Sequence, residues 1–376
     1  MWKGAPAGFL LAVLAFAALS APVASTQQPT LMPQTSNTTA DLIAVSPVDE
    51  NVVWAAGTNS TFVVTTDGGK SWRSGVIPEA EAEDIQFRDV QGVSSQVAYL
   101  LSIGNLTGDF RIYKTTDGGA SWTLQFENQL ANAFYDCFAF WTPTSGIAHS
   151  DSVNGVFPDL RTTDGMSWQS IANNMPPALP GEASFSSSGT CVATQGTGNA
   201  WIATGVSSIA RILATTDGGN TWAAYDTPLH SSPTAGGFSV AFRDASNGIL
   251  GGGDLAPVDV DTVAQTAVSH DGGQTWQLTN RPPLNYAIFC LAYLSNTTGF
   301  GGQRRDRQNQ AKQGGTDYSR TVVATADIGG AAWTPDEGTT WYPLKGVTGY
   351  WGVAFANPQN GWMVGVNGTI LKVSFP

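Results

Sequence analysis

The stretch TTDGGKSW at residues 65–72 recurs along the chain, and its recurrence decides the fold. Four further full copies fit the pattern [ST]-x-D-x-G-x-[ST]-W, namely TTDGGASW at 115–122, TTDGGNTW at 215–222, SHDGGQTW at 269–276 and TPDEGTTW at 334–341. A sixth copy, TTDGMSW at 162–168, is one residue shorter. The closing tryptophans lie 46–65 residues apart. A period of about 40–50 residues with several strands in each repeat is typical of a β-propeller.

Each copy has the composition of a self-contained turn. Its aspartate carboxylate can accept hydrogen bonds from turn amides and from the flanking hydroxyl groups, its glycine tolerates a positive φ, and its tryptophan can fold back as an apolar contact. We therefore predict structural roles for the repeated aspartates and tryptophans. They are Asp67, Asp117, Asp164, Asp217, Asp271 and Asp336, and Trp72, Trp122, Trp168, Trp222, Trp276 and Trp341.

A second pattern alternates with the octapeptides. It consists of short segments in which large residues alternate with small ones, as expected of an inner strand packed between neighbouring blades. Each is followed by a polar turn and a second apolar strand. Seven segments fit, at residues 42–45, 84–87, 137–140, 191–194, 239–242, 290–293 and 352–355.

The two ends of the chain reconcile seven inner strands with six octapeptides. Residues 369–373 resemble the strand that precedes an octapeptide elsewhere, and residues 31–34 stand where an outer strand would. We predict that the N-terminal strand completes the last blade and closes the ring, which removes its open edge. The expected fold is one all-β, seven-bladed propeller over residues 26–376. In the sixth blade, Thr325–Trp333 looks like a degenerate second copy, and we prefer Asp336 as the box carboxylate.

The composition and the N-terminal sequence limit the classes of function and the cellular compartment that we expect. With 42% hydrophobic and 12% charged residues, the 376-residue chain can bury a large core, so wholesale disorder is excluded. The formal charge of −12 disfavours a nucleic-acid partner, which needs a basic face. Lys3 and the following apolar run predict a signal peptide over residues 1–25 and no stable membrane span, because the run is shorter than a span requires. We expect an exported protein, periplasmic or secreted, with a charge of −13 once Lys3 is removed.

The three cysteines, Cys137, Cys191 and Cys290, all stand at the first position of a predicted inner strand. An odd number leaves at least one thiol unpaired. We expect small buried residues here rather than a redox or metal cluster. Equivalent positions on adjacent inner strands should lie too far apart for a disulfide.

The repeated motif resembles the Asp box, or BNR repeat. The whole mature chain resembles the seven-bladed propellers of the photosystem II stability/assembly factor family and its non-photosynthetic bacterial relatives. The resemblance lies in the T-T-D-G-G-x-[ST]-W boxes and in segments such as the one at residues 353–371. It implies a non-catalytic binding or assembly module, which we expect to be monomeric. In photosynthetic members it implies binding of assembly intermediates through a basic surface, from which this acidic chain departs.

An exported glycoside hydrolase of the BNR-repeat type is the alternative. The arginine motif F/Y-R-I/L-P of sialidases is absent. The nearest strings, Phe87-Arg88-Asp89 and Phe242-Arg243-Asp244, follow predicted inner strands and are interpreted as turn residues. A hydrolase using two aspartates from loops of one face stays open. His149, His230 and His270 are dispersed, and we predict no metal and no cofactor.

Two long segments mark a candidate binding face. Both are predicted to be hairpins between strands two and three, at residues 253–261 of blade five and Gln303–Ser319 of blade six. Long loops are where function concentrates. The partner would be a protein or a glycan, although two solvated insertions that pair loosely explain the same pattern. Asp254, Asp259 and Asp261 also form a weak calcium-type pattern. The candidate residues are Asp254, Asp259, Asp261, Arg304, Arg305 and Arg307.

Overall fold

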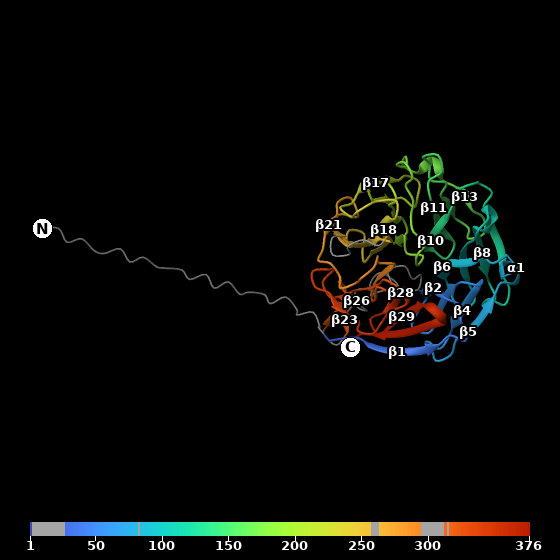
Figure 1. The fold of residues 1–376 in the computed structure, drawn as a ribbon, viewed down its shortest axis with the longest axis horizontal. Helices are drawn as coiled ribbons and strands as arrows, with labels where there is room; N and C mark the ends of the chain where they lie inside the picture. The colour runs from blue at the N-terminus through green and yellow to red at the C-terminus, as the bar shows by residue number, and fades with distance from the viewer. Residues whose placement is uncertain (2–26, 82, 257–262, 295–311, 314–315) are drawn as a thin grey trace.

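The computed structural model describes Met1 and residues 27–81, 83–256, 263–294, 312–313 and 316–376. Their strands form seven four-stranded antiparallel sheets, arranged as blades around a central axis (Figure 1). The predicted seven-bladed propeller is therefore confirmed. A separate two-stranded pair consists of β23 (Lys312–Gln313) and β24 (Thr316–Asp317).

Blades one to five run from the inner to the outer strand in chain order. Blade one contains β2 (Leu42–Pro47), β3 (Val53–Gly57), β4 (Thr61–Thr65) and β5 (Arg73–Val76). Blade two contains β6 (Gln86–Gly92), β7 (Ala98–Ile103), β8 (Arg111–Thr115) and β9 (Thr123–Glu127). Blade three contains β10 (Tyr135–Thr142), β11 (Ser145–Ser150), β12 (Leu160–Thr162) and β13 (Gln169–Ser170). Blade four contains β14 (Val192–Gln195), β15 (Asn199–Ala203), β16 (Arg211–Thr215) and β17 (Ala223–Asp226). Blade five contains β18 (Ala235–Phe242), β19 (Gly248–Asp254), β20 (Thr266–Ser269) and β21 (Gln277–Leu278).

The last two blades differ in how they are assembled. Blade six contains β22 (Cys290–Tyr293), β25 (Val322–Thr325), β26 (Ala331–Thr334) and β27 (Tyr342–Pro343). Blade seven contains β28 (Tyr350–Asn357), β29 (Asn360–Gly365), β30 (Thr369–Ser374) and, as its outer strand, β1 (Thr30–Thr35). Helical structure is confined to short turns, of which α1 (Pro78–Glu81) is the α-helical one in the described chain.

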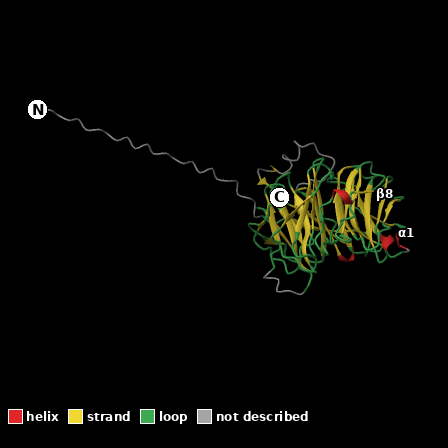
Figure 2. Ribbon diagram, turned by 90° about the horizontal axis from the view of Figure 1, so that it is seen from above, coloured by secondary structure: helices red, strands yellow, loops and turns green. Residues whose placement is uncertain are grey.

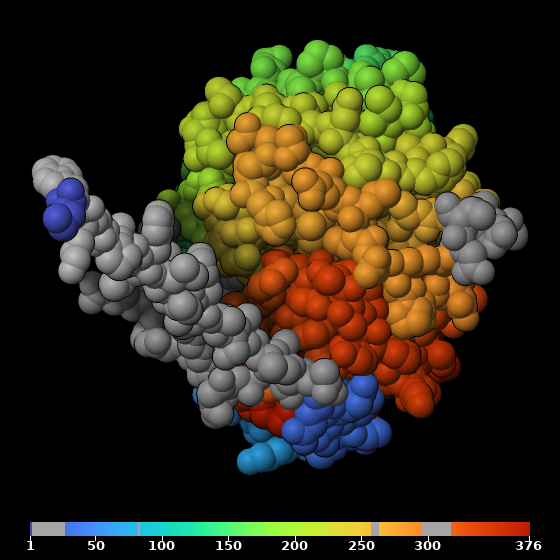
Figure 3. Space-filling view, turned by 90° about the vertical axis from the view of Figure 1, so that its left-hand side faces the viewer, coloured from blue at the N-terminus to red at the C-terminus, as the bar shows by residue number. Residues whose placement is uncertain are grey.

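The N-terminal strand closes the ring as predicted. β1 pairs antiparallel with β30, in a register that runs from Thr30 opposite Ser374 to Thr35 opposite Thr369. In Figure 3 the blue N-terminal strand lies against the red C-terminal blade. Because both ends of the chain contribute to one sheet, the ring has no open seam between blades seven and one.

The propeller has two faces, which Figure 2 shows at the two ends of the strands. We call one the box face, because it carries the Asp-box turns between strands three and four of blades one to six and also the turns between strands one and two. We call the other the mouth face. It carries the turns between strands two and three and the connections from each outer strand to the next inner strand.

Apolar side chains fill the spaces between blades. Seven buried clusters each join two neighbouring blades around the ring. Every box tryptophan packs in the cluster shared with the preceding blade, as Trp276 of blade five does with Trp201 and Leu250. The box therefore joins blades as well as closing a turn.

Candidate functional site

The Asp-box turns share one hydrogen-bond pattern. In the first copy, Asp67 Oδ1 accepts hydrogen bonds from the Ser71 amide (3.0 Å) and the Thr65 hydroxyl (2.8 Å), and Asp67 Oδ2 accepts one from the Ser71 hydroxyl (2.6 Å). These bonds, led by that from the Ser71 hydroxyl, lower the pKa of Asp67 to about 2. The bond from the preceding hydroxyl recurs at Asp117, Asp164, Asp217, Asp271 and Asp336.

Box carboxylates stand in six different blades and engage their own turns, so they do not converge on one site. The sixth copy uses Asp336 as preferred: its Oδ1 accepts the Thr340 amide at 2.7 Å. The degenerate copy around Asp327 is instead the turn between β25 and β26.

Of the six candidate binding residues, Asp254 belongs to the described part of the chain. Asp254 ends β19, where its Oδ1 accepts the Thr234 hydroxyl (2.6 Å) and the Ala256 amide (2.8 Å), so it is engaged in its local turn. The other candidates, Asp259, Asp261, Arg304, Arg305 and Arg307, lie outside the described residues.

The predicted position of segment Gln303–Ser319 is wrong. β22 pairs directly with β25, so the chain between Tyr293 and Val322 joins strands one and two of blade six. Both ends of this connection therefore lie on the box face, whereas the ends of the long segment of blade five lie on the mouth face. A hairpin between strands two and three would make Val322–Thr325 the third strand of the blade, whereas it is the second. The ends of the two long segments therefore lie on opposite faces of the propeller, so the prediction of one shared face is wrong.

Five inner strands carry a β-bulge near the mouth. In each of them one residue has no direct partner in the neighbouring strand: Ile43, Arg88, Asp136, Phe238 and Trp351. A bulge bends the strand and re-aims a side chain, and bulges are frequent beside functional sites. The same structural position therefore presents five unlike side chains around one opening. This ring of unlike residues is the candidate functional site.

An eighth apolar cluster lies across the mouth, and we call it the aromatic arc: Phe185, Phe238, Tyr286, Phe289 and Trp351. Phe185 stacks on Phe238 with ring centroids 3.7 Å apart. Phe289 lies 6.3 Å from Phe238, 5.7 Å from Tyr286 and 5.0 Å from Trp351. Phe185, Tyr286 and Trp351 are only partly buried. Unlike the seven other clusters, the arc spans the starts of blades five, six and seven.

Arg88 extends the arc with a positive charge. Its guanidinium carbon lies 5.5 Å from the ring centroid of Trp351. The interpretation of Arg88 and Asp89 as turn residues is wrong, because both lie inside β6. The inner strand of blade two begins later than its apolar pattern indicated, since the bulge at Arg88 breaks the alternation.

Next to Arg88 lies a group of buried acids. The pKa of Asp136 is raised well above its ordinary value, first by burial and then by the neighbouring carboxyl of Asp151. Behind them, Asp159 Oδ2 lies 2.9 Å from His149 Nδ1, and both of these side chains are fully buried. Burial and the second carboxyl group thus both disfavour the ionised form of Asp136. A buried carboxyl group against a second one differs from the open, separated pair of a glycoside hydrolase.

The connection 171–191, between β13 and β14, crosses the mouth. At its outer part Glu182 forms a buried ion pair with Arg211, with Oε1 2.9 Å from Nε. Further along, the Ser184 amide donates to Asp151 Oδ1 at 2.8 Å. This is the longest described link from an outer strand to the next inner strand, and such long ordered loops are commonly functional.

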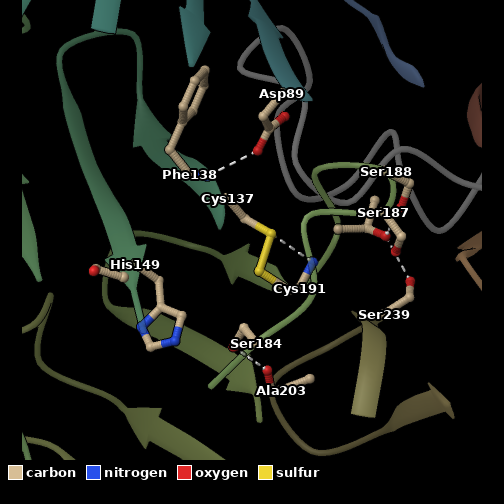
Figure 4. Close-up of a disulfide and its surroundings, with 12 residues drawn as sticks. Asp89, Cys137, Phe138, His149, Ser184, Ser187, Ser188, Cys191, Ala203 and Ser239 are labelled. Carbon is tan, nitrogen blue, oxygen red and sulfur yellow. Dashed lines mark hydrogen bonds between the residues drawn. A yellow bond between two sulfur atoms is a disulfide. The ribbon is translucent and has the colours of Figure 1, made fainter. Parts of the chain in front are cut away.

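Near the axis the same connection lies beside the Cys137–Cys191 disulfide, with Ser184, Ser187 and Ser188 on it (Figure 4). The hydroxyls of Ser187 and Ser188 donate to the Phe289 carbonyl at 3.0 and 2.7 Å. Gly189 has φ +77°, and a Cβ there would lie 2.3 Å from Asp89 Oδ1, so only glycine fits. The crossing segment thereby ties blades two, four and six together.

A disulfide joins Cys137 to Cys191, with Cα atoms 6.0 Å apart (Figure 4). The prediction that these positions lie too far apart is wrong. Cys137 follows the bulge of β10 and Cys191 directly precedes β14, where the inner strands of adjacent blades come close beside the axis. The Cys191 amide lies 3.3 Å from Cys137 Sγ. Cys290 is a buried free thiol, as expected for the unpaired cysteine.

An axial cavity of about 130 Å³ lies among the inner strands. Its wall consists mainly of small apolar side chains, including Ala139, Ala193 and Ala241. Asp89 lines it as well, and burial raises the pKa of this carboxyl well above its usual range. Asp89 Oδ2 accepts the Phe138 amide at 2.8 Å, a bond from one blade to the next.

Within the described residues no group of three or more histidine, cysteine, aspartate or glutamate side chains could hold a metal ion. No helix in the described part of the chain is long and apolar enough to cross a membrane.

Sequence reasoning missed the mouth. Its residues come from inner strands and connections that are far apart in the chain, as Ser188 and Phe289 are. One usable signal was present: aromatic or charged residues directly precede the regular part of several inner strands, at Arg88, Asp136, Phe238, Phe289 and Trp351.

Comparisons with known proteins agree with the fold. The family model described as "BNR/Asp-box repeat" matches residues 267–278. No curated protein matches the chain in sequence. A solved structure described as "YCF48 bound to D1 peptide" has 18% identity and a TM-score of 0.59, covering 94% of this chain and 99% of that one. "YCF48 from Cyanidioschyzon merolae" has 18% identity and a TM-score of 0.58, covering 92% and 98%. The expected resemblance to the propellers of this assembly-factor family is thus supported at the level of fold.

Proposed function

We propose that this protein is a non-catalytic binding module, of the assembly- or stability-factor kind, whose mouth face holds a segment of another protein. One observation carries the proposal: the aromatic arc is an apolar cluster with partly exposed members that spans three blades, beside a charged residue. Aromatic side chains and arginine are the residues most enriched where proteins bind one another.

The structural neighbours favour the same kind of ligand. One of them is described as bound to a peptide, which makes a peptide segment a reasonable occupant of this fold. The crossing segment 171–191 supports the proposal as well. By fixing Phe185 against Phe238 and closing the axis, it gives the mouth face a rigid floor on which little ordering would be needed at binding.

Export is part of the proposal. The predicted signal peptide over residues 1–25 is now joined by the Cys137–Cys191 disulfide. Disulfides persist in oxidising compartments and are rare in the cytosol. Mass spectrometry of the mature protein would test both points, since it reports the N-terminal residue and the loss of two hydrogens on oxidation.

The glycoside hydrolase alternative gains no support from the acids near the mouth, because Asp136 is 1% exposed and lies against Asp151. A glycan ligand is distinguished from a peptide by experiment. We would screen the folded full-length protein against immobilised short random peptides and, in parallel, against a panel of immobilised glycans.

The screen includes Trp351→Ala and a matched control, Trp341→Ala. Both tryptophans are half-buried, but Trp351 stands at the mouth and Trp341 in a box turn. We expect peptides that bind the wild type and the control but lose affinity for Trp351→Ala. Equal binding by all three proteins, or binding of glycans alone, would refute the proposal. Circular dichroism of each variant checks that it folds.

A further inference from the structure

Arg88 differs from the other arginines that begin or flank strands at the mouth face. Arg111 lies 2.6 Å from Glu83 Oε2, and Arg211 is paired with the buried Glu182. Arg88 forms no salt bridge with any carboxylate in the described ranges of the chain. Its buried Nε also has no hydrogen-bond partner there. A partly buried guanidinium with an unused donor is costly, and a bound anion would offset that cost.

The guanidinium is nevertheless fixed in place. Its Nη2 donates to Gln86 Oε1 at 3.1 Å, and its carbon lies over the Trp351 ring. Stacking on an aromatic face leaves the edge of the guanidinium plane available. A carboxylate is a planar acceptor that matches this edge with two parallel hydrogen bonds.

The buried Asp136 forms no salt bridge with Arg88. Asp136 is the group that acts on it most strongly, but burial and Asp151 raise the pKa of Asp136 well above the ordinary value. Asp159, which also acts on Asp136, is engaged with His149 Nδ1 and the Ser150 amide. Neither of these acids forms a salt bridge with Arg88, so its guanidinium has no paired carboxylate in the described part of a chain whose net charge is −12.

We propose that Arg88 is a specificity-determining residue of the mouth face, and that it binds a carboxylate of the segment held on the aromatic arc. This inference rests on the proposed function and adds the chemistry of the ligand: a carboxylate next to an apolar or aromatic side chain. The carboxylate can come from an aspartate or glutamate side chain or from a carboxyl terminus, and the experiment separates the two.

The experiment starts from one peptide selected on the wild-type protein. Three versions are titrated against the full chain by calorimetry: the parent with a free carboxyl terminus, the same peptide with a carboxamide end, and one with its acidic side chains changed to amides. Each is measured with wild type, Arg88→Gln and Arg88→Lys. The control is Arg73→Gln, because Arg73 lies 5.7 Å over the Phe62 ring but belongs to the box face.

We expect that removing the essential carboxylate weakens binding to wild type by about tenfold or more, as for a lost charge-assisted pair. The same change should have little effect on Arg88→Gln, and Arg88→Lys should recover part of the affinity. Arg73→Gln should bind like wild type. Whichever modified peptide loses affinity identifies the source of the carboxylate.

Three results would overturn the inference. In the first, the selected peptides need Trp351 but bind equally well in their amide forms, and bind Arg88→Gln as well as wild type. That result would support the proposed function but refute the proposed role of a ligand carboxylate. Weaker binding to Arg88→Gln without any dependence on a peptide carboxylate would assign Arg88 a packing role. If no peptide binds the wild type at all, the proposed function fails first.

Discussion

The two faces of this propeller are built in opposite ways. On the box face, one turn recurs in six blades with the same carboxylate bonds, from Asp67 to Asp336. On the mouth face, the bulged position of the inner strand holds a different residue in each of five blades, among them Arg88, Asp136 and Trp351. Repetition is what a fold needs, since every blade faces the same packing task. Divergence at one equivalent position is what a binding site needs, and it supports the mouth face as the proposed site.

The largest effect on stability is expected when a tryptophan is replaced by alanine on the box face, compared with the same substitution on the mouth face. Trp276 is 8% exposed between two blades, so Trp276→Ala should lower the free energy of unfolding by about 3–5 kcal/mol. Trp351→Ala removes a half-buried side chain and should cost about 1 kcal/mol. Denaturant unfolding measures both. Equal losses would mean that the mouth is part of the core and would remove the contrast between the faces.

The next effect concerns the crossing segment. Replacing both Cys137 and Cys191 by serine should cost about 2–4 kcal/mol, because the bridge closes a separation of 54 residues. It should also speed amide hydrogen exchange in residues 184–190. Cys290→Ser is the matched control, since a serine hydroxyl already occupies the equivalent place at Ser239, accepting the Leu291 amide at 3.0 Å. A control that is as destabilised as the double variant would contradict the expectation.

The carboxyl groups of the two faces should affect the pH dependence of stability in opposite directions. Bonds led by that from the Ser121 hydroxyl lower the pKa of Asp117 to about 2, below the ordinary 3.8, so its contribution is present above about pH 4 and lost as the pH falls toward 2. The pKa of Asp136 is raised, so its carboxyl group ionises less readily in the folded than in the unfolded protein. The free energy of unfolding should therefore decrease as the pH rises above about 4. Asp117→Asn should reduce the loss of stability in acid, whereas Asp136→Asn should raise stability near pH 7. Unfolding measured from pH 2 to 7 tests both signs, and matching signs would disprove the assignment.

The smallest effect is that of Arg88→Gln on stability. Losing the contact with Trp351 costs less than about 1 kcal/mol. Removing a partly buried charge without a counter-ion acts in the opposite direction. We expect a melting curve close to that of the wild type. A loss above about 2 kcal/mol would show that Arg88 is a structural residue, like Arg211.

The periodic parts of the fold could be predicted from the sequence. The seven inner-strand segments predicted the number of blades, and the strands at the two ends predicted the closure by β1 and β30, because both predictions depend on repeated local patterns. Where the pattern breaks, prediction failed. The bulge at Arg88 shifted the strand of blade two, and Val322–Thr325 was assigned to the wrong place in blade six.

The site was harder to predict than the fold for a physical reason. Side chains that are in contact at the mouth lie far apart in the sequence, as Cys137 and Cys191 or Ser188 and Phe289 do. No local sequence pattern encodes such contacts. The sequence also suggests no reason why two cysteines at equivalent positions should be close. Only the geometry of the ring near its axis brings them together.

Pairing of β1 with β30 sets the order of events during biosynthesis. Of all the strands in the ring, β1 leaves the ribosome first and its partner leaves last, so the nascent chain carries an unsatisfied strand throughout its synthesis. The ring therefore closes only after translation of Thr369–Ser374. Until then the exposed edge of β1 is open to other chains, and a chaperone or a translocation channel that covers it would protect the unfinished molecule from aggregation.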